Sequence, residues 1–87
     1  MIARKITYEG RLDAAAAEVV FDIARRIEIT GEIKFVGPNR VELDLEGDPS
    51  MIKLIQHQVE RKLKTQVERK HITPMPYKNY TGLDLLR

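Results

Sequence analysis

The chain has 87 residues, of which 43% are hydrophobic and 32% are charged, and its formal net charge at pH 7 is +2. This length suits one small domain, the apolar content is too high for a disordered chain, and the lack of cysteine excludes disulfides and thiolate chemistry. No apolar run approaches the roughly 20 residues of a membrane-spanning helix and the N-terminal segment lacks the apolar centre of a signal peptide, so a cytoplasmic protein without a membrane partner is expected.

Residues 2–9 alternate between apolar and polar side chains, which predicts a half-buried strand with Ile6 and Tyr8 on its inner face. Asp13 then predicts a helix start, because its carboxylate accepts the free amide hydrogens of a first turn. The helix is expected over residues 14–27, where apolar side chains recur at helical spacing. Its predicted buried stripe consists of Ala16, Val19, Val20, Ile23, Ala24 and Ile27.

Two further strands are predicted over residues 32–36 and 40–46, joined by the turn sequence Gly37-Pro38-Asn39. Alternation in the second of these strands turns Val41, Leu43 and Leu45 inward. The opposite face is expected to be a solvated acidic row, partly neutralised by Lys5 or Lys34 on neighbouring strands. The row consists of Glu42, Asp44 and Glu46.

A second helix is predicted from its cap Asp48 to about Lys64, with Pro49 in the first helical position. The residues expected to be buried in it are Ile52, Ile55, Val59 and Leu63. A fourth strand follows over residues 66–73. Its apolar residues Val67 and Ile72 are five positions apart and cannot share a face of a regular strand, so a bulge or an edge position is expected.

The order β-α-β-β-α-β predicts an α+β ferredoxin-like sandwich, in which two helices cover one face of an antiparallel four-stranded sheet. Residues 1–75 form this domain. The tail, residues 76–87, is apolar enough to dock on the domain or on a partner. The tail residues expected to mediate that contact are Tyr77, Tyr80, Leu83, Leu85 and Leu86.

Within this order, the segment GEIKFVGPNRVELDLEG resembles the acylphosphatase family, in which a glycine opens the second strand and the pattern V-E-[VI]-x-x-E-G follows a turn. Upstream, Gly10-Arg11 matches the start of the family's glycine-rich loop. The matching positions of the segment are Gly31, Val41, Glu42, Leu43, Glu46 and Gly47. The resemblance implies the acylphosphatase form of the ferredoxin-like fold.

In that family, backbone amides of the loop and an arginine bind phosphate, and an asparagine on the second strand positions the attacking water. Here the loop reads RLDAAAAE, without an internal glycine, and Asp13 places a negative charge at the helix start. Ala17 stands at the arginine position and Phe35 at the asparagine position; a shift of one residue would place Glu18 there instead of Ala17. The resemblance therefore implies a fold without its activity, and no enzyme and no cofactor are expected.

A metal site is not expected either. His57 and Glu60 lie three residues apart on the second helix, but two ligands do not make a site, and exposed helix positions explain both.

The charge is divided unevenly along the chain, since residues 1–50 carry a net charge of −3 and residues 51–87 one of +5. A small interaction or self-associating module, with a protein partner or a second copy as in a homo-oligomer, is the leading hypothesis. RNA binding through the basic face of the second helix is the alternative, and acylphosphatase activity is a remote third. The basic residues concerned are Lys53, Arg61, Lys62, Lys64, Arg69 and Lys70.

Overall fold

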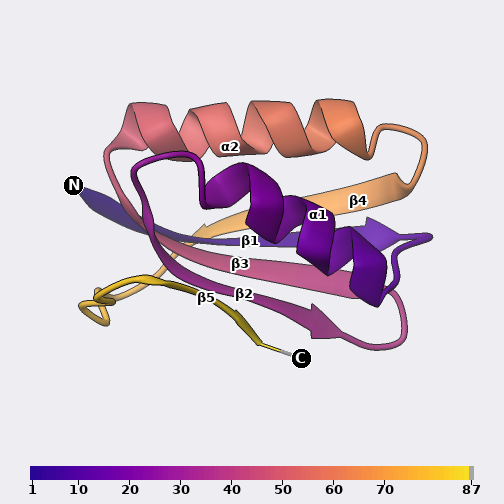
Figure 1. The fold of residues 1–87 in the computed structure, drawn as a ribbon, viewed down its shortest axis with the longest axis horizontal. Coiled ribbons are helices and arrows are strands. Elements are labelled where there is room, and N and C mark those ends of the chain that lie inside the picture. Colours follow the sequence, from indigo (N-terminus) through magenta and orange to yellow (C-terminus); the bar gives the residue numbers. More distant parts are fainter. Residues whose placement is uncertain (87) are drawn as a thin grey trace.

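The computed structural model describes residues 1–86 as a five-stranded sheet with two helices packed on one of its faces (Figure 1). The order of the strands across the sheet is β4-β1-β3-β2-β5. The strands are β1 (Ile2–Gly10), β2 (Thr30–Val36), β3 (Arg40–Gly47), β4 (Val67–Pro74) and β5 (Leu83–Leu86). This is the predicted α+β ferredoxin-like architecture with one strand added.

The prediction of an antiparallel four-stranded sheet is wrong, because the tail contributes a fifth strand and makes the sheet mixed. β1, β2, β3 and β4 pair antiparallel, whereas β5 pairs parallel to β2, from Gly31 opposite Leu83 to Lys34 opposite Leu86. β5 has only four residues, which is too few for alternation to stand out in the sequence. Its apolar residues Leu83 and Leu85 pack against the core and close the β2 edge.

The two helices begin where their caps predict. α1 (Ala14–Ala24) is capped by Asp13, and α2 (Pro49–Lys62) is capped by Asp48, each through its carboxylate. α1 ends three residues before the predicted position. The Arg25 amide still bonds to the Phe21 carbonyl four residues back, but the amides of Arg26 and Ile27 bond to carbonyls three residues back, as in a tightened last turn, so the helical pattern stops there.

The core lies between the helices and the inner face of the sheet. Tyr8 on β1 and Leu43 on β3 are fully buried under α2 residues such as Ile55, as their alternation predicted. The buried set also contains Ile6, Leu12, Ala16, Ala17, Val20, Ala24, Ile33, Val41, Leu45, Ile52, Val59 and Leu63. Within residues 1–86, neither helix has the length and apolar character required to cross a membrane.

β4 is an edge strand with an irregularity, and both features confirm the prediction from its apolar spacing. Its pairing with β1 shifts register between Glu9 and Gly10, opposite the segment from Val67 to Arg69. The shift lets Val67 pack against the core. Ile72 lies beside Ile6 on the helix side but is 43% exposed, so the edge strand extends beyond the cover that the helices provide.

Candidate functional site

The loop between β1 and α1, where the resemblance places a phosphate-binding loop, is held by hydrogen bonds within the chain. The Arg11 amide donates to the Gln66 carbonyl oxygen at 2.8 Å. The Arg11 guanidinium donates through Nη2 to the Thr65 carbonyl oxygen at 2.9 Å. The guanidinium of this loop is therefore already bonded to the turn that follows α2.

The start of α1 is likewise occupied by the chain's own carboxylate. Asp13 accepts the Ala16 amide through Oδ1 at 3.0 Å. A helix start attracts anions through free amides and the positive end of the helix dipole. Here a bound anion would meet the negative charge of Asp13 instead.

A small cavity of 110 Å³ lies between the start of α1, β2 and β5. Ala17 is buried there and Phe35 is half-buried, so the two positions aligned with the arginine and asparagine do lie together. The sequence did not indicate that the C-terminal strand would complete this cavity. Its lining residues are Ala14, Ala17, Glu18, Phe35, Leu85 and Leu86, which are apolar except for Glu18.

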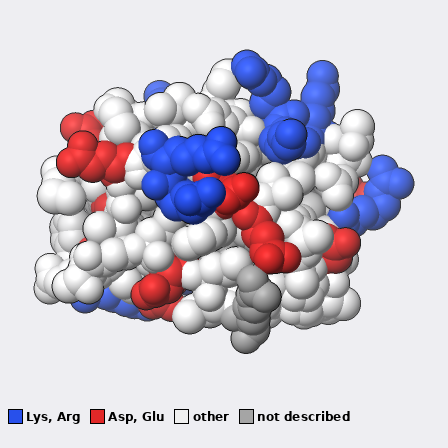
Figure 2. Space-filling view, in the orientation of Figure 1, with Lys and Arg blue, Asp and Glu red and all other residues white. Residues whose placement is uncertain are grey.

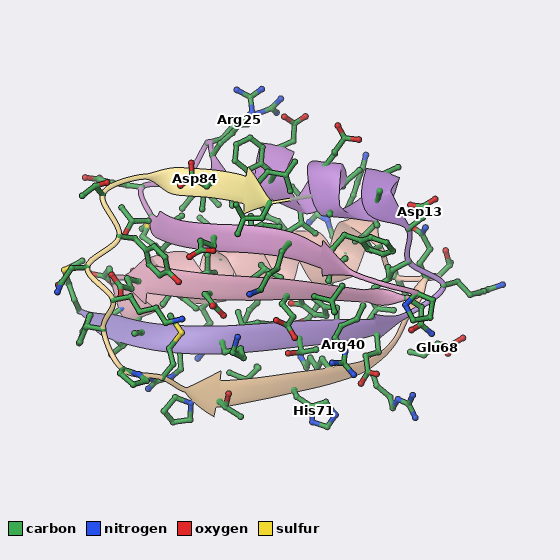
Figure 3. The ribbon with its side chains drawn as sticks, turned by 90° about the horizontal axis from the view of Figure 1, so that it is seen from below. Asp13, Arg25, Arg40, Glu68, His71 and Asp84 are labelled. Carbon is green, nitrogen blue, oxygen red and sulfur yellow. The ribbon has the colours of Figure 1, made fainter. Side chains whose placement is uncertain are left out.

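The C-terminal segment crosses one end of the sheet, from β4 to β5, on the face opposite the helices (Figure 3). There the Glu46 carboxylate accepts three consecutive amides, from Lys78, from Asn79 at 3.2 Å and from Tyr80 at 3.0 Å. Asn79 has a φ of 58°, and this left-handed turn directs successive amides at one anion. Glu46 and its neighbour Asp44 are only 3% and 2% exposed, so the prediction of a solvated row is wrong for both.

Some of the tail residues predicted to mediate interaction pack against their own domain, and others are exposed. Leu83 and Leu85 pack against the core of their own domain, and Tyr80 is tied to Glu46 through its amide. Tyr77 donates its hydroxyl to the Met1 carbonyl oxygen, yet its side chain remains exposed, as does that of Leu86. The described part of the tail thus docks on its own sheet.

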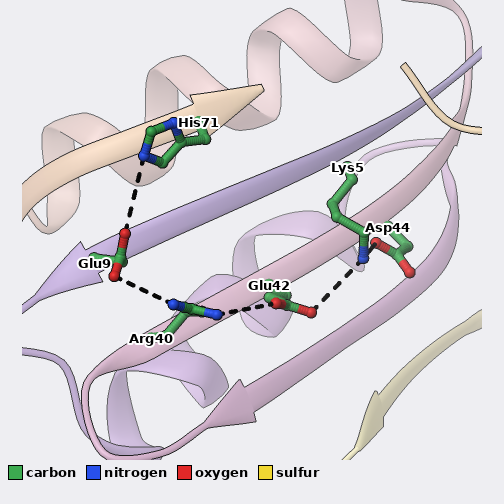
Figure 4. A network of polar contacts seen from close by, with 6 residues as sticks. All are labelled: Lys5, Glu9, Arg40, Glu42, Asp44 and His71. Atoms are coloured by element: carbon green, nitrogen blue, oxygen red, sulfur yellow. Dashed lines mark hydrogen bonds and ion pairs between the residues drawn. The ribbon is translucent and has the colours of Figure 1, made fainter. Parts of the chain in front are cut away.

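A row of side chains that alternate between basic and acidic crosses the open face of the sheet (Figure 4). Its closest contact joins Lys5 Nζ to Asp44 Oδ1 at 2.8 Å, which confirms the predicted pairing of Lys5 with the acidic row. The other contacts drawn lie between 3.4 and 4.0 Å. The side chains, in order, are His71, Glu9, Arg40, Glu42, Lys5 and Asp44. Opposite charges therefore neutralise one another across this face.

The Lys5–Asp44 pair predicts a specific alkaline behaviour. Its hydrogen bond raises the pKa of Lys5 above the ordinary value of 10.5. A group whose pKa is raised by folding contributes its full stabilisation below its unfolded pKa and loses it as the pH rises through the folded pKa. Above pH 10.5 we therefore expect the free energy of unfolding, measured in urea, to fall more steeply for the wild type than for Lys5→Met. Parallel pH profiles would contradict this expectation.

On the helix side, Glu60 of α2 ties the helix to two strands. The buried Tyr8 hydroxyl donates to Glu60 Oε2 at 2.9 Å, and Lys70 Nζ donates to Oε1 at 2.8 Å. Burial raises the pKa of Tyr8, and the negative charge of Glu60 adds to the effect. Glu60 thus satisfies the polar atom of a core tyrosine and pairs with Lys70, a member of the predicted basic cluster.

Replacing Tyr8 with phenylalanine is expected to lower the free energy of unfolding by about 1–2 kcal/mol, because Glu60 Oε2 loses its donor beside the core. Lys70→Met is the matched control. It removes the other partner of Glu60, but at an exposed site, where such a pair contributes about 0–1 kcal/mol. Urea unfolding measures the free energy of unfolding of both variants. Equal losses would show that the hydrogen bond of the buried hydroxyl contributes no more than the exposed ion pair.

The six basic residues of the predicted nucleic-acid surface do not form one surface. Arg69 faces the open side of the sheet beside Glu9, whereas Lys70 pairs with Glu60 on the helix side. Arg61 and Lys62 form the basic end of α2. Figure 2 shows Lys and Arg side chains over this end of α2, and a separate group over the C-terminal end of α1.

The structure also tests the histidine–glutamate pair on α2. Both oxygens of Glu60 are used by Tyr8 and Lys70, and His57 lines a hollow beside α1. Across residues 1–86, no three side chains of the metal-binding types converge on a common point.

No protein-family model matches this sequence, and no curated protein matches it significantly. Solved structures do match. The crystal structure of acylphosphatase from Bacillus subtilis superposes with a TM-score of 0.86 at 17% identity, covering 100% of both chains. An acylphosphatase structure from Coxiella burnetii gives 0.83 at 16% identity, over 98% of this chain and 92% of that one.

A larger protein contains a similar domain. The crystal structure of T. kodakarensis HypF matches with a TM-score of 0.85 at 21% identity, over 100% of this chain but 12% of the HypF chain. At such identities the similarity concerns the backbone and not the chemistry of individual side chains. The matches to the Bacillus subtilis acylphosphatase and to HypF cover the whole of this chain, so they include β5, the strand that the C-terminal segment adds. The chain therefore has the fold of the acylphosphatases.

Proposed function

We propose that this chain is a non-catalytic interaction module built on the acylphosphatase fold. The observation that carries the proposal is the apolar cavity that contains Ala17 and Phe35. Binding and hydrolysing an acyl phosphate at this place would require a guanidinium for the phosphate and an amide side chain to orient water. A methyl group and a phenyl ring provide neither, and Leu85 from β5 makes the same space more apolar.

The neighbouring loop supports the same proposal. A phosphate-binding loop presents several free backbone amides and a free cation to the anion. In this chain, the Arg11 guanidinium is bonded to the Thr65 carbonyl, and Asp13 accepts the amide of Ala16 in the first turn of α1. Releasing these groups for a phosphate would break bonds that hold the loop to the rest of the domain.

Hydrolysis of benzoyl phosphate, a simple acyl phosphate, tests the proposal directly. We expect the purified chain to hydrolyse it no faster than buffer, while the Bacillus subtilis acylphosphatase, assayed in parallel, provides the positive control. A rate that the chain accelerates and that Arg11→Ala abolishes would overturn the proposal, because Arg11 is the cation of this loop.

If the chain does not hydrolyse acyl phosphates, its role is to bind a partner, which is either another protein or a second copy of the chain. Because the described tail already docks on its own sheet, the tail is less suited to join two copies than its composition suggested. Light scattering at several concentrations distinguishes the two partners. A monomeric mass directs the search to a different protein, and a dimeric mass makes the second copy the partner.

Nucleic-acid binding is the weaker candidate. The cations left together are Arg61, Lys62 and Lys64, all exposed at the end of α2. Proteins that bind single strands combine such cations with aromatic platforms on which bases stack. Here Phe35 and Tyr8 belong to the interior, and the open sheet face is neutralised by its own ion pairs.

A further inference from the structure

A groove runs between α1 and α2 on the outer side of the helical layer. It consists of two adjoining hollows of 490 and 330 Å³, which share Ile23 and Lys62 in their walls. The walls are formed by Val19, Asp22, Ile23 and Arg26 from the α1 side and by Leu54, His57, Gln58, Arg61 and Lys62 from α2. This surface is called the helical groove below.

The floor of the helical groove is aliphatic. Val19 and Ile23 are only partly covered by the core beneath them, and Leu54 is 40% exposed. The exposed part of Leu54 adds no stability to the isolated chain, because only apolar surface removed from water is stabilising. Together the three side chains offer apolar contact area to a binding partner.

The rim of the groove is positively charged. Among the described residues that form its walls, Asp22 is the only acidic one, and it already pairs with Arg25 at 2.8 Å and with Arg26 at 4.0 Å. Among the described residues, Arg61 and Lys62 have no carboxylate within ion-pair distance. Both project at the basic end of α2. The rim thus has cations available for a partner's carboxylates.

We infer that the helical groove binds an acidic amphipathic helix of a protein partner, an inference that rests on the proposed interaction function. An apolar stripe on such a helix would cover Val19, Ile23 and Leu54, while its acidic residues would meet Arg61 and Lys62. RNA fits less well, because none of the described residues that line the groove is Phe, Tyr or Trp, and these residues offer no platform for base stacking.

The test uses a fluorescein-labelled peptide of about five helical turns, with leucines at i, i+3, i+4 and i+7 and glutamates on the other face. A peptide of the same composition in permuted order keeps the charge but loses the apolar stripe. A uridine oligonucleotide of similar charge represents RNA. Fluorescence anisotropy measures the binding of each probe to the full chain.

Two double variants with the same change in net charge separate the groove from general electrostatics. Arg61→Glu/Lys62→Glu alters the rim, whereas Lys53→Glu/Lys64→Glu alters exposed lysines outside the groove. We expect the rim variant to weaken binding of the amphipathic peptide about tenfold and the control variant to weaken it about twofold or less. Circular dichroism checks that both variants remain folded.

Nuclear magnetic resonance on the unaltered chain locates the peptide independently of any variant. The expected result is amide shift changes centred on Ile23, Leu54 and Lys62. Shifts elsewhere, equal binding of the permuted peptide, equal losses in the two double variants, or no binding up to about 1 mM would each overturn the inference. Tighter binding of the oligonucleotide, weakened by Lys53→Glu/Lys64→Glu, would overturn it in favour of RNA. None of these results depends on benzoyl phosphate hydrolysis, which tests the proposed function separately.

Discussion

Replacing Gly31 with alanine is expected to lower the free energy of unfolding by about 3 kcal/mol, one of the two largest losses we predict for a single substitution in this chain. Gly31 has a φ of 150°, a conformation that residues with a Cβ rarely adopt. A Cβ at this position would also overlap the carbonyl oxygen of Asp44 on the adjacent strand. The position of the Cβ is fixed by the backbone of β2, and the carbonyl oxygen belongs to the backbone of β3, so neither can turn aside.

Gly82→Ala is the matched control for this prediction. The Gly82 carbonyl accepts the Gly31 amide at 2.9 Å, so the two glycines are neighbours, yet a Cβ on Gly82 would meet no atom within 4 Å. Urea unfolding should therefore show little change for Gly82→Ala. If the two variants lose equal stability, the close approach of β2 to β3 is not the cause of the loss. The lower flexibility of the unfolded chain cannot be the cause either, because it would by itself stabilise both variants.

Much of this fold could be predicted from local patterns, because each pattern has a local physical cause. Asp13 and Asp48 mark helix starts because a carboxylate satisfies the amides directly after it. The separation of Val67 and Ile72 identified an irregular edge strand, because side chains of a regular strand alternate with a period of two. These features required no knowledge of which element packs on which.

The predictions from sequence were wrong where a segment distant in the chain determines whether a side chain is buried or exposed. Alternation correctly placed Asp44 and Glu46 on the outer face of β3, but it cannot tell whether solvent or protein covers that face. Glu46 is bonded to backbone amides of residues 78–80, which carry no sequence pattern, and Asp44 pairs with the side chains of Lys5 and Lys78, which come from other segments. The acidic row was therefore read as solvated.

In the candidate site, too, some features could be predicted from the sequence and others depend on a distant segment. The resemblance indicated that Ala17 and Phe35 share a site, because the fold places the start of α1 beside β2. The contribution of Leu85 and Leu86 to that site was missed, since a four-residue strand cannot be distinguished from an apolar tail. Lys70 was assigned to a basic cluster by its position in the chain, but its partner Glu60 belongs to another element.

Glu46 is the second position where a large effect is expected. Glu46→Ala should lower the free energy of unfolding by about 3 kcal/mol, because three amides lose their acceptor at a site shielded from solvent. The cost is limited by the release of residues 76–86, after which the amides can bind water. Hydrogen exchange of the Leu83–Leu86 amides should accelerate in proportion, because β5 depends on this attachment to stay beside β2.

Glu42→Ala provides the control, since Glu42 lies on the same face of the same strand, but its ion pairs with described residues are long, at 3.7 Å to Lys5 and 3.9 Å to Arg40. Both pairs are long and their cations are partly exposed, so they contribute about 0–1 kcal/mol, and unfolding and exchange should change little. If Glu46→Ala releases β5, the cavity beside Phe35 loses Leu85 and Leu86, and Phe35 becomes accessible to water. Unchanged exchange of β5 in Glu46→Ala would instead mean that Leu83 and Leu85 hold the strand by apolar packing alone.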